Sequence, residues 1–482
     1  MKQLFLLAGV LAGVGVETMG MVSKKEKKLP NVVFILADDL GYGDLSCYGQ
    51  KKFQTPNIDR LALNGLRFTQ CYSGTTVSAP SRACLMTGLH SGHVPIRGNK
   101  EVQPEGQMAL PSGLTTLFQL FKQAGYTTGC FGKWGLGAPE SVGAPNHQGV
   151  DQFFGFNCQL LAHNYYADHL WENDQRVDLL ENADGKYGVY TQDLIHERGL
   201  QFVEKHRDQS FFLFLPYVLP HAELLVPEDS IIQQFRGKFP EKAFHGCDSG
   251  PYFRKGGYCS QKAPRATFAA MVYRLDVYVG QIVEKLKELG IYENTLFIFC
   301  SDNGPHQEGG ADPDFFNSNG IYRGYKRDLY EGGIRVPFIV SWPGVIRSGE
   351  SDLICSFWDI LPTFAQLTDV SLKERLDGIS LLPLWMANGK QQKHDYLYFE
   401  FHEEGGRQAV RKGNWKLVRL NVSMGNDQIK TELYNLDIDP SEQHDLSKEF
   451  PKKVEELLKI IRKEHEFDGH WPLLYEEKIV KS

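Results

Sequence analysis

The sequence predicts an α/β protein in which helices cover both faces of a large, mostly parallel sheet, with a smaller C-terminal α+β part. Continuous apolar runs at 31–36, 211–215 and 295–299 are typical of buried parallel strands. Helical patterns separate these runs, and strands that alternate with helices form parallel sheets. After about Leu381 the pattern changes to short strands with turn residues between them, which indicates an antiparallel sheet.

The other elements can be placed in order along the chain. Thr55 and Pro56 begin a helix, since proline is favoured in the first turn. A long helix is expected along the apolar face from Phe268 to Leu286, closed by Gly290. Further elements are a helix at 114–124, strands at 126–131, 396–401, 408–411, 415–419 and 432–434, and a helix at 450–467. We therefore expect one domain at 29–380 and a smaller one at 381–482.

The first 20 residues have the pattern of a signal peptide. Met1 and Lys2 precede an apolar run at 4–16, and small and polar residues follow it. This run is too short to span a bilayer, and no other stretch is long and apolar enough to do so. We expect an exported protein without a membrane span.

Charge and cysteine content narrow the possible partners. The 482 residues carry a net charge of −7 with both signs well mixed, and no basic tract suggests a nucleic-acid partner. The nine cysteines lack the C-x-x-C spacing of metal sites. Cys247 and Cys259 flank a short loop and are the expected disulfide.

The sharpest motif runs from Ser78 to Gly88 and reads S-A-P-S-R-A-C-L-M-T-G. It resembles, at every defined position, the signature C/S-x-P-S-R-x-x-L-x-T-G of the formylglycine-dependent sulfatases. Capping of a helix would explain the Ser-x-Pro start, but not Arg82 and Thr87-Gly88 at their spacings. The resemblance implies that Ser78 is oxidised to formylglycine and that Arg82 lies beside it.

Formylglycine chemistry explains why this family modifies its nucleophile. The hydrated aldehyde has two hydroxyls: one attacks sulfur and displaces the alcohol, and the other then expels sulfate. An unmodified serine has one hydroxyl and would be trapped as a sulfate ester. Serine-type signatures resemble those matured by radical enzymes of bacteria, so the resemblance implies such a maturase as a partner and a periplasmic or extracellular location.

Two acidic pairs follow buried strands. Asp38-Asp39 ends the first apolar run, and Asp302-Asn303 ends a later one. Adjacent buried acids repel unless a cation neutralises them, and carboxylate and amide oxygens suit calcium or magnesium. The residues alone leave these two metals open. In the family that the signature resembles, these four positions and the formylglycine, here at Ser78, hold calcium.

Two lysines and a histidine resemble further family blocks. Lys133, in F-G-K-W-G-L-G, takes a sulfate-binding position, and Lys326 takes the second. His221 follows Pro220 after the strand at 211–215 and takes the position of a catalytic histidine that protonates the leaving alcohol. The family often has histidine two positions after the first lysine, where this chain has Gly135. Asp38, Arg82, His93 and His306 are candidates for that missing role.

The C-terminal part also resembles the family. Lys412-Gly-Asn-Trp-Lys416 and Glu432-Leu-Tyr-Asn-Leu-Asp-Ile-Asp-Pro-Ser-Glu442 match two of its blocks, so the resemblance covers residues 30 to about 470. The fold that it implies is that of the alkaline phosphatase superfamily, an α/β sandwich with a small C-terminal subdomain.

We therefore expect a sulfatase that hydrolyses sulfate esters of a sulfated carbohydrate or glycan. The alternatives are a phosphoester or phosphonate hydrolase on the same fold, and a non-catalytic protein that binds sulfated glycans with an unmodified Ser78. The sugar, its sulfated position and exo or endo action stay open. Candidate substrate-binding residues in polar loops are His93, Arg97, Asn99, His163, His402 and Arg407.

Overall fold

The central strand of the large sheet is β1 (Asn31–Ala37), which pairs in parallel with β9 on one side and β8 on the other. The computed structural model describes residues 29–250 and 253–481, so the expected signal peptide at 1–20 lies outside the described residues. The sheet has ten strands in the order β11-β2-β10-β9-β1-β8-β4-β5-β6-β7. The bounds are β2 Leu66–Phe68, β4 Thr127–Lys133, β5 Gln152–Phe156, β6 His169–Glu172, β7 Gln175–Asp178, β8 Phe211–Pro216, β9 Thr295–Ser301, β10 Phe338–Ser341 and β11 Gly349–Ser351.

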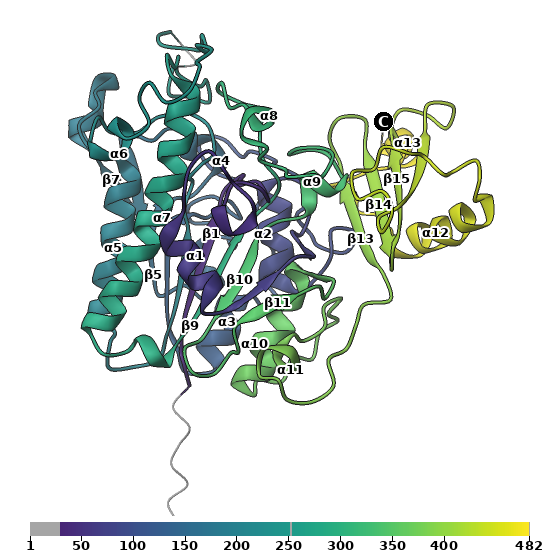
Figure 1. The fold of residues 1–482 in the computed structure, drawn as a ribbon, viewed down its shortest axis with the longest axis horizontal. Helices are drawn as coiled ribbons and strands as arrows, with labels where there is room; N and C mark the ends of the chain where they lie inside the picture. The colour runs from purple at the N-terminus through teal and green to yellow at the C-terminus, as the bar shows by residue number, and fades with distance from the viewer. Residues whose placement is uncertain (1–28, 251–252, 482) are drawn as a thin grey trace, which may run out of the picture.

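Helices cover both faces of this sheet, as the sequence predicts (Figure 1). The side chains of β1 alternate: Phe34 and Leu36 enter the core on one face, while Val33 and Ile35 enter the core on the other. The first core is closed by α2 (Ser78–Thr87), α3 (Leu117–Gln123) and α10 (Ile360–Thr368). The second is closed by α1 (Pro56–Leu63), α5 (Thr191–Lys205) and α7 (Pro264–Glu288).

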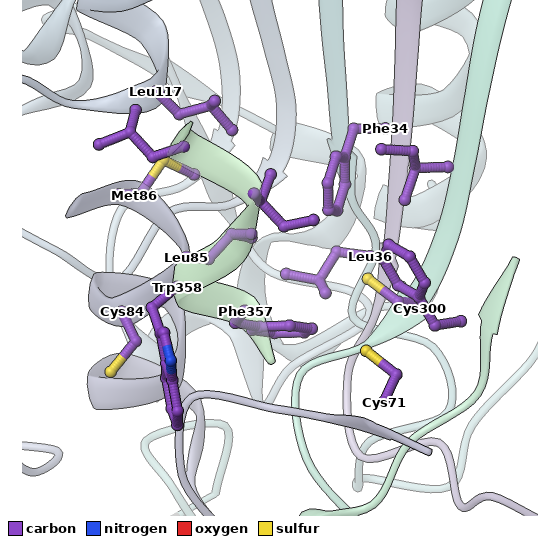
Figure 2. Packing of buried hydrophobic residues seen from close by; sticks show 14 of the residues in the cluster. Phe34, Leu36, Cys71, Cys84, Leu85, Met86, Leu117, Cys300, Phe357 and Trp358 are labelled. Atoms are coloured by element: carbon purple, nitrogen blue, oxygen red, sulfur yellow. The ribbon is translucent and has the colours of Figure 1, made fainter. Parts of the chain in front are cut away.

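The first core joins segments far apart in the sequence. Figure 2 shows Phe34, Leu36 and Cys300 of the strands beside Leu85 and Met86 of α2, with Phe357 and Trp358 from the turn before α10. Here α2 is buried along its whole length, so its first residue is held firmly against the sheet edge.

The remaining short elements are β3 Cys71–Tyr72, β12 Cys355–Ser356, α4 Gln159–Ala162, α6 Ser230–Gln233, α8 Pro313–Phe316, α9 Glu331–Ile334, α11 Leu382–Trp385 and the 3-10 turns Ser46–Tyr48, Pro145–Gln148, Leu180–Gly185, Tyr292–Asn294 and Phe357–Asp359.

The C-terminal part is a four-stranded antiparallel sheet, which confirms the predicted α+β subdomain. One face, including Val410 and Leu417, packs on Leu457 of α12, and the other joins the first core through Phe399. Trp385 of α11 also lies in the first core, so this helix packs with the large part. The bounds are β13 Leu397–Phe401, β14 Arg407–Lys412, β15 Trp415–Leu420, β16 Lys430–Asn435, α12 Pro451–Glu464 and α13 Tyr475–Lys481.

A buried ion group fixes the two parts together. Lys416 on β15 places Nζ 2.9 Å from Glu331 of α9 and 3.0 Å from Glu442, and all three side chains are buried. Burial of charge is tolerated only when each ion has a partner, so this contact specifies how the parts dock.

The predicted disulfide is wrong, because Cys247 and Cys259 are both free thiols. The backbone N–H of Cys247 donates to Tyr258 (2.8 Å), so Cys247 lies opposite Tyr258 and not opposite Cys259. Successive side chains of an extended segment point to opposite sides, which keeps the two thiols apart. No helix in the described ranges 29–250 and 253–481 has the length and apolar character needed to cross a membrane.

Candidate active site

Four polar side chains meet at the carboxyl ends of β1 and β9. Ala37 pairs with Ser301, so the residues that follow these two strands share one edge of the sheet. The N–H of Asp39 donates to Oδ1 of Asp302 (3.1 Å), and Nδ2 of Asn303 donates to Oδ1 of Asp39 (2.7 Å). The two acidic pairs picked out from the sequence therefore form one buried cluster.

The signature motif places Ser78 and Arg82 against this cluster. Ser78 is the first residue of α2, is 2% exposed, and donates from Oγ to Oδ1 of Asp38 (3.0 Å). Arg82 lies one helical turn later on the same side of α2. Its guanidinium binds Oδ2 of Asp302 (2.9 and 3.1 Å) and the carbonyl of Lys133 (2.7 Å).

Each of the two predicted lysines pairs with one of the adjacent acids. Lys133 ends β4 and places Nζ 2.6 Å from Oδ2 of Asp38. Lys326 places Nζ 2.9 Å from Oδ2 of Asp39 and 3.2 Å from Oε2 of Glu308. Positive charge therefore lies on both sides of the acidic pair.

Burial and charge set the protonation of the acids. Burial favours a neutral Asp38, but the positive charges around it, Lys133 foremost and Arg82 among the others, together outweigh burial and hold the pKa of Asp38 well below its ordinary value. Burial, together with the negative charge of Asp38, raises the pKa of Asp302 to about 7 despite Arg82. The cluster thus retains a repulsion between carboxylates that a further cation would relieve.

The donor set fits a hard divalent cation. Three carboxylates converge with Asn303, whose Oδ1 is buried and has no hydrogen-bond partner among the described residues. An orphaned amide oxygen beside carboxylates is a ligand set of the calcium or magnesium type. Asp38, Asp39, Asp302 and Asn303 are the residues that could hold such an ion.

His221 follows β8 and lies against Lys326. Its Nε2 is 3.0 Å from Nζ of Lys326, and its Nδ1 contacts the carbonyl of Ala222. Burial and the charge of Lys326 lower the pKa of His221 to about 4, so the ring is neutral near pH 7. Nδ1 then carries the hydrogen, and Nε2 accepts one from Lys326.

This geometry differs from the protonated His221 expected from the sequence. Burial alone would lower the pKa of Lys326, but Asp39 and Glu308 outweigh burial and hold it above its ordinary value. The exchangeable proton of the pair therefore resides on Nζ of Lys326, and His221 orients it.

Sequence reasoning missed Glu308, which continues a chain of alternating charge from the site to the surface. Asp39 binds Lys326, Lys326 binds Glu308, and Glu308 binds Arg327, with side-chain exposures of 0, 5, 17 and 35%. Glu308 also accepts from the hydroxyl of Tyr258 (3.2 Å). The only signal in the sequence was its position shortly after Asp302-Asn303.

Three of the six candidate substrate residues lie at or near this cluster. Oδ1 of Asn99 accepts from the N–H of Ala79, next to Ser78 (3.0 Å). The ring of His163 stacks on His221, with centroids 5.0 Å apart. Arg407 reaches the loop after Lys326, where it binds Asp328 (2.8 Å).

The other three candidates bind a network around the C-terminal part. Nδ1 of His93 is 2.8 Å from Asp377, Arg97 donates to the carbonyl of Glu466 (2.6 Å), and His402 is 2.9 Å from Glu400. Arg97 thus holds the loop after α2 against the C-terminal part, whereas His402 binds within that part.

His90, His93 and Asp377 form a second group with the residue types of a metal site. However, Nδ1 of His90 accepts from Gly92, and Nε2 of His93 accepts from Arg375. Each neutral ring then donates its single hydrogen to a carboxylate and keeps no free lone pair for a metal. This group is a hydrogen-bond network.

The comparison with known families matches residues 30–370, most of the chain, to the sulfatase family. The chain belongs to the sulfatase family. Residues 320–466 also match the family described as N-sulphoglucosamine sulphohydrolase, C-terminal. The resemblance inferred from the sequence and the expected fold are thus confirmed, and the chain is a hydrolase of sulfate esters.

The similar proteins match most of the length of this sulfatase. An N-acetylgalactosamine-6-O-sulfatase of Bacteroides thetaiotaomicron is 28% identical over 543 residues, covering 96% of this chain and 99% of the relative. Human arylsulfatase A is 32% identical over 421 residues, covering 80% and 74%. The crystal structure of Ps i-CgsB has a TM-score of 0.76 at 28% identity, covering 94% and 96%, and that protein was also solved in complex with k-i-k-neocarrahexaose.

Proposed function

We propose that this sulfatase removes sulfate from a sulfated carbohydrate, with a formylglycine made from Ser78 as nucleophile and a bound calcium ion. The observation that carries the proposal is the hydroxyl of Ser78, held at the buried end of α2 on Asp38 within a ring of carboxylates and cations. The carbohydrate is supported by the relatives that match from end to end, whose names specify sugar sulfates.

The residues of the chain divide the work. Asp38, Asp39, Asp302 and Asn303 would hold the calcium ion, which would supply positive charge to the sulfuryl oxygens. The formylglycine hydrate supplies the two hydroxyls at position 78. Arg82 fixes the position of Asp302 and of the carbonyl of Lys133. The ammonium groups of Lys133 and Lys326 offset the charge on the sulfuryl oxygens in the transition state.

The proton for the leaving alcohol comes from Nζ of Lys326. This ammonium is held by Asp39, Glu308 and the acceptor Nε2 of His221. A sugar alkoxide is a poor leaving group, so transfer of this proton as the sulfur–oxygen bond breaks lowers the barrier.

Mass spectrometry combined with assays tests the nucleophile. Oxidation removes two hydrogens from the Ser78 side chain, and we propose that a radical-type bacterial maturase takes up the two electrons. Turnover should rise in proportion to the oxidised fraction when the chain is co-expressed with such a maturase. Full activity in protein that retains plain serine in the peptide spectrum contradicts the formylglycine proposal.

The same protein separates the alternatives. Faster hydrolysis of an aryl phosphate than of an aryl sulfate would favour the phosphoester hydrolase. Binding of sulfated glycans without turnover, by protein with an unmodified Ser78, would favour the binding protein.

We also propose export to a bacterial periplasm, on the pattern of residues 1–20. Recovery of the chain with an intact N-terminus from the cytoplasmic fraction would contradict it.

A further inference from the structure

Buried polar atoms without a partner gather in the segment that follows β5. Within residues 157–163, Nδ2 and Oδ1 of Asn157, Nε2 of Gln159 and Nδ1 of His163 have no hydrogen-bond partner among the described residues. Asn157 is 3% and Gln159 is 6% exposed. Proteins rarely leave such groups unpaired, because each one sacrifices its hydrogen bonds to water. Four of them in one short segment indicate a surface that is completed by a ligand.

This segment borders the strand that carries Lys133. β5 pairs with β4 so that Phe156 lies opposite Lys133, and the N–H of Gly135 donates to the carbonyl of Asn157 (3.2 Å). The side chain of Gln159 then folds over Gly135. A Cβ at Gly135 would stand 2.4 Å from Nε2 of Gln159, and Gly135 has a φ of +74°. Only glycine leaves room there for the amide.

The other end of α4 lies in the field of the site cations. His163 stacks on His221, and burial together with the positive charges of Lys133 and Lys326 lowers the pKa of His163 well below its ordinary value. Gln159, the first residue of α4, thus lies over Gly135, two residues after Lys133, and the C-cap His163 stacks on His221, the partner of Lys326.

The chemistry of the unpaired atom selects its ligand. Nε2 of an amide is a hydrogen donor with no lone pair for a metal ion. The ammonium of Lys133 is also a donor, so the two groups cannot satisfy each other. An anionic oxygen is the acceptor that suits an amide donor and an ammonium together.

We propose that Gln159 binds the substrate directly, donating from Nε2 to a sulfuryl oxygen beside Lys133, in the space that Gly135 keeps open. The side chain of Gln159 thereby occupies the space beside Gly135, the position at which the family often has a histidine. This inference rests on the proposed function and adds a substrate-binding residue to it.

Inhibition by inorganic sulfate tests the role of Gln159. The measurement uses calcium-loaded, matured enzyme with an aryl sulfate as substrate. Gln159→Leu removes the donor at similar size, and a hydrogen bond to a charged group is worth about tenfold or more in affinity. The inhibition constant for sulfate should rise by about tenfold or more in this variant. The matched control is Leu160→Ala, which disturbs the same helix but removes no polar group.

Gln159→Glu guards against a folding defect in the leucine variant. It keeps the size and polarity of the side chain but sets a negative charge beside the bound sulfate, so sulfate inhibition should weaken at least as much. An inhibition constant within twofold of wild type in both Gln159 variants overturns the proposal, as does an equal rise in Leu160→Ala. If the matured wild-type enzyme does not hydrolyse the aryl sulfate at all, that result would instead count against the proposed function.

Discussion

The His221–Lys326 pair should matter in proportion to how poor the leaving group is. His221→Ala removes the acceptor Nε2, 3.0 Å from Nζ of Lys326, and leaves that ammonium to Asp39 and Glu308. One of its three hydrogens then has no acceptor to fix its direction. A sugar alkoxide needs this proton, whereas a nitrophenolate leaves without it.

The size of the effect follows from general acid catalysis, which contributes about 10²–10⁴-fold. At 1.36 kcal/mol for each tenfold, this is about 2.7–5.5 kcal/mol of barrier. His221→Ala should slow a sulfated sugar by about this factor and an aryl sulfate by less than about tenfold. Lys326→Met should slow both substrates, because its charge also offsets the sulfuryl oxygens.

The assay compares kcat/KM for both substrates in wild type, the two single variants and the double variant, each with its oxidised fraction of Ser78 measured. Since the two groups act as a unit, the double variant should lose no more than about tenfold beyond the worse single variant on the sugar. Equal losses of His221→Ala on the two leaving groups refute the reasoning, and so do losses that multiply in the double variant.

Three further predictions concern the metal, the docking contact and pH. Exhaustive chelation should abolish turnover and lower the unfolding temperature, because Asp38, Asp39 and Asp302 then repel one another. Added calcium should restore both. Activity in protein that elemental analysis shows to be metal-free would reject the requirement for a metal. Lys416→Met should lower the free energy of unfolding in urea by about 3–5 kcal/mol, because buried Glu442 then has no cation beside it among the described residues and Glu331 keeps only Arg335. The exposed Lys412→Met should cost less than about 1 kcal/mol, and similar losses in the two variants count against the docking role. Burial opposes the charged form of His465, but Glu400 and Glu477 outweigh burial and raise its pKa, so its contribution to stability is fully present below about pH 6.5 and is lost as pH rises through the folded pKa. His465→Gln should therefore flatten the fall in unfolding free energy above that pH, and an unchanged slope would exclude this contribution.

Local patterns were enough to predict the central strands and the acidic pairs. The acidic pairs at Asp38 and Asp302 each follow a continuous apolar run of a few residues, which is typical of a buried strand. Adjacent parallel strands then bring the ends of the two runs together. The positions of Ser78 and Arg82 came from the resemblance to the family signature, and in the structure one turn of α2 separates them.

Features that depend on distant partners were not predictable in this way. Strand β2 has three residues and exists because β10 and β11 pair with it. Glu308 is distinguished from other surface acids only by Lys326 and Arg327, which the chain brings to it. The expected Cys247–Cys259 bond failed because one residue of register separates facing side chains from opposed ones.

The position of β1 at the centre of the sheet affects how the protein is made. β1 leaves the ribosome first, but it pairs at Val32 with Phe212 and at Asn31 with Thr295, which are synthesised much later. Pairing at such sequence separation is slow, so the early part of the chain stays open during synthesis. In the finished fold Ser78 is 2% exposed at the end of a buried helix. Under the proposed maturation of Ser78, an enzyme that encloses residues 78–88 would act before β9 is made, and the rate of sheet closure would set the oxidised fraction of Ser78.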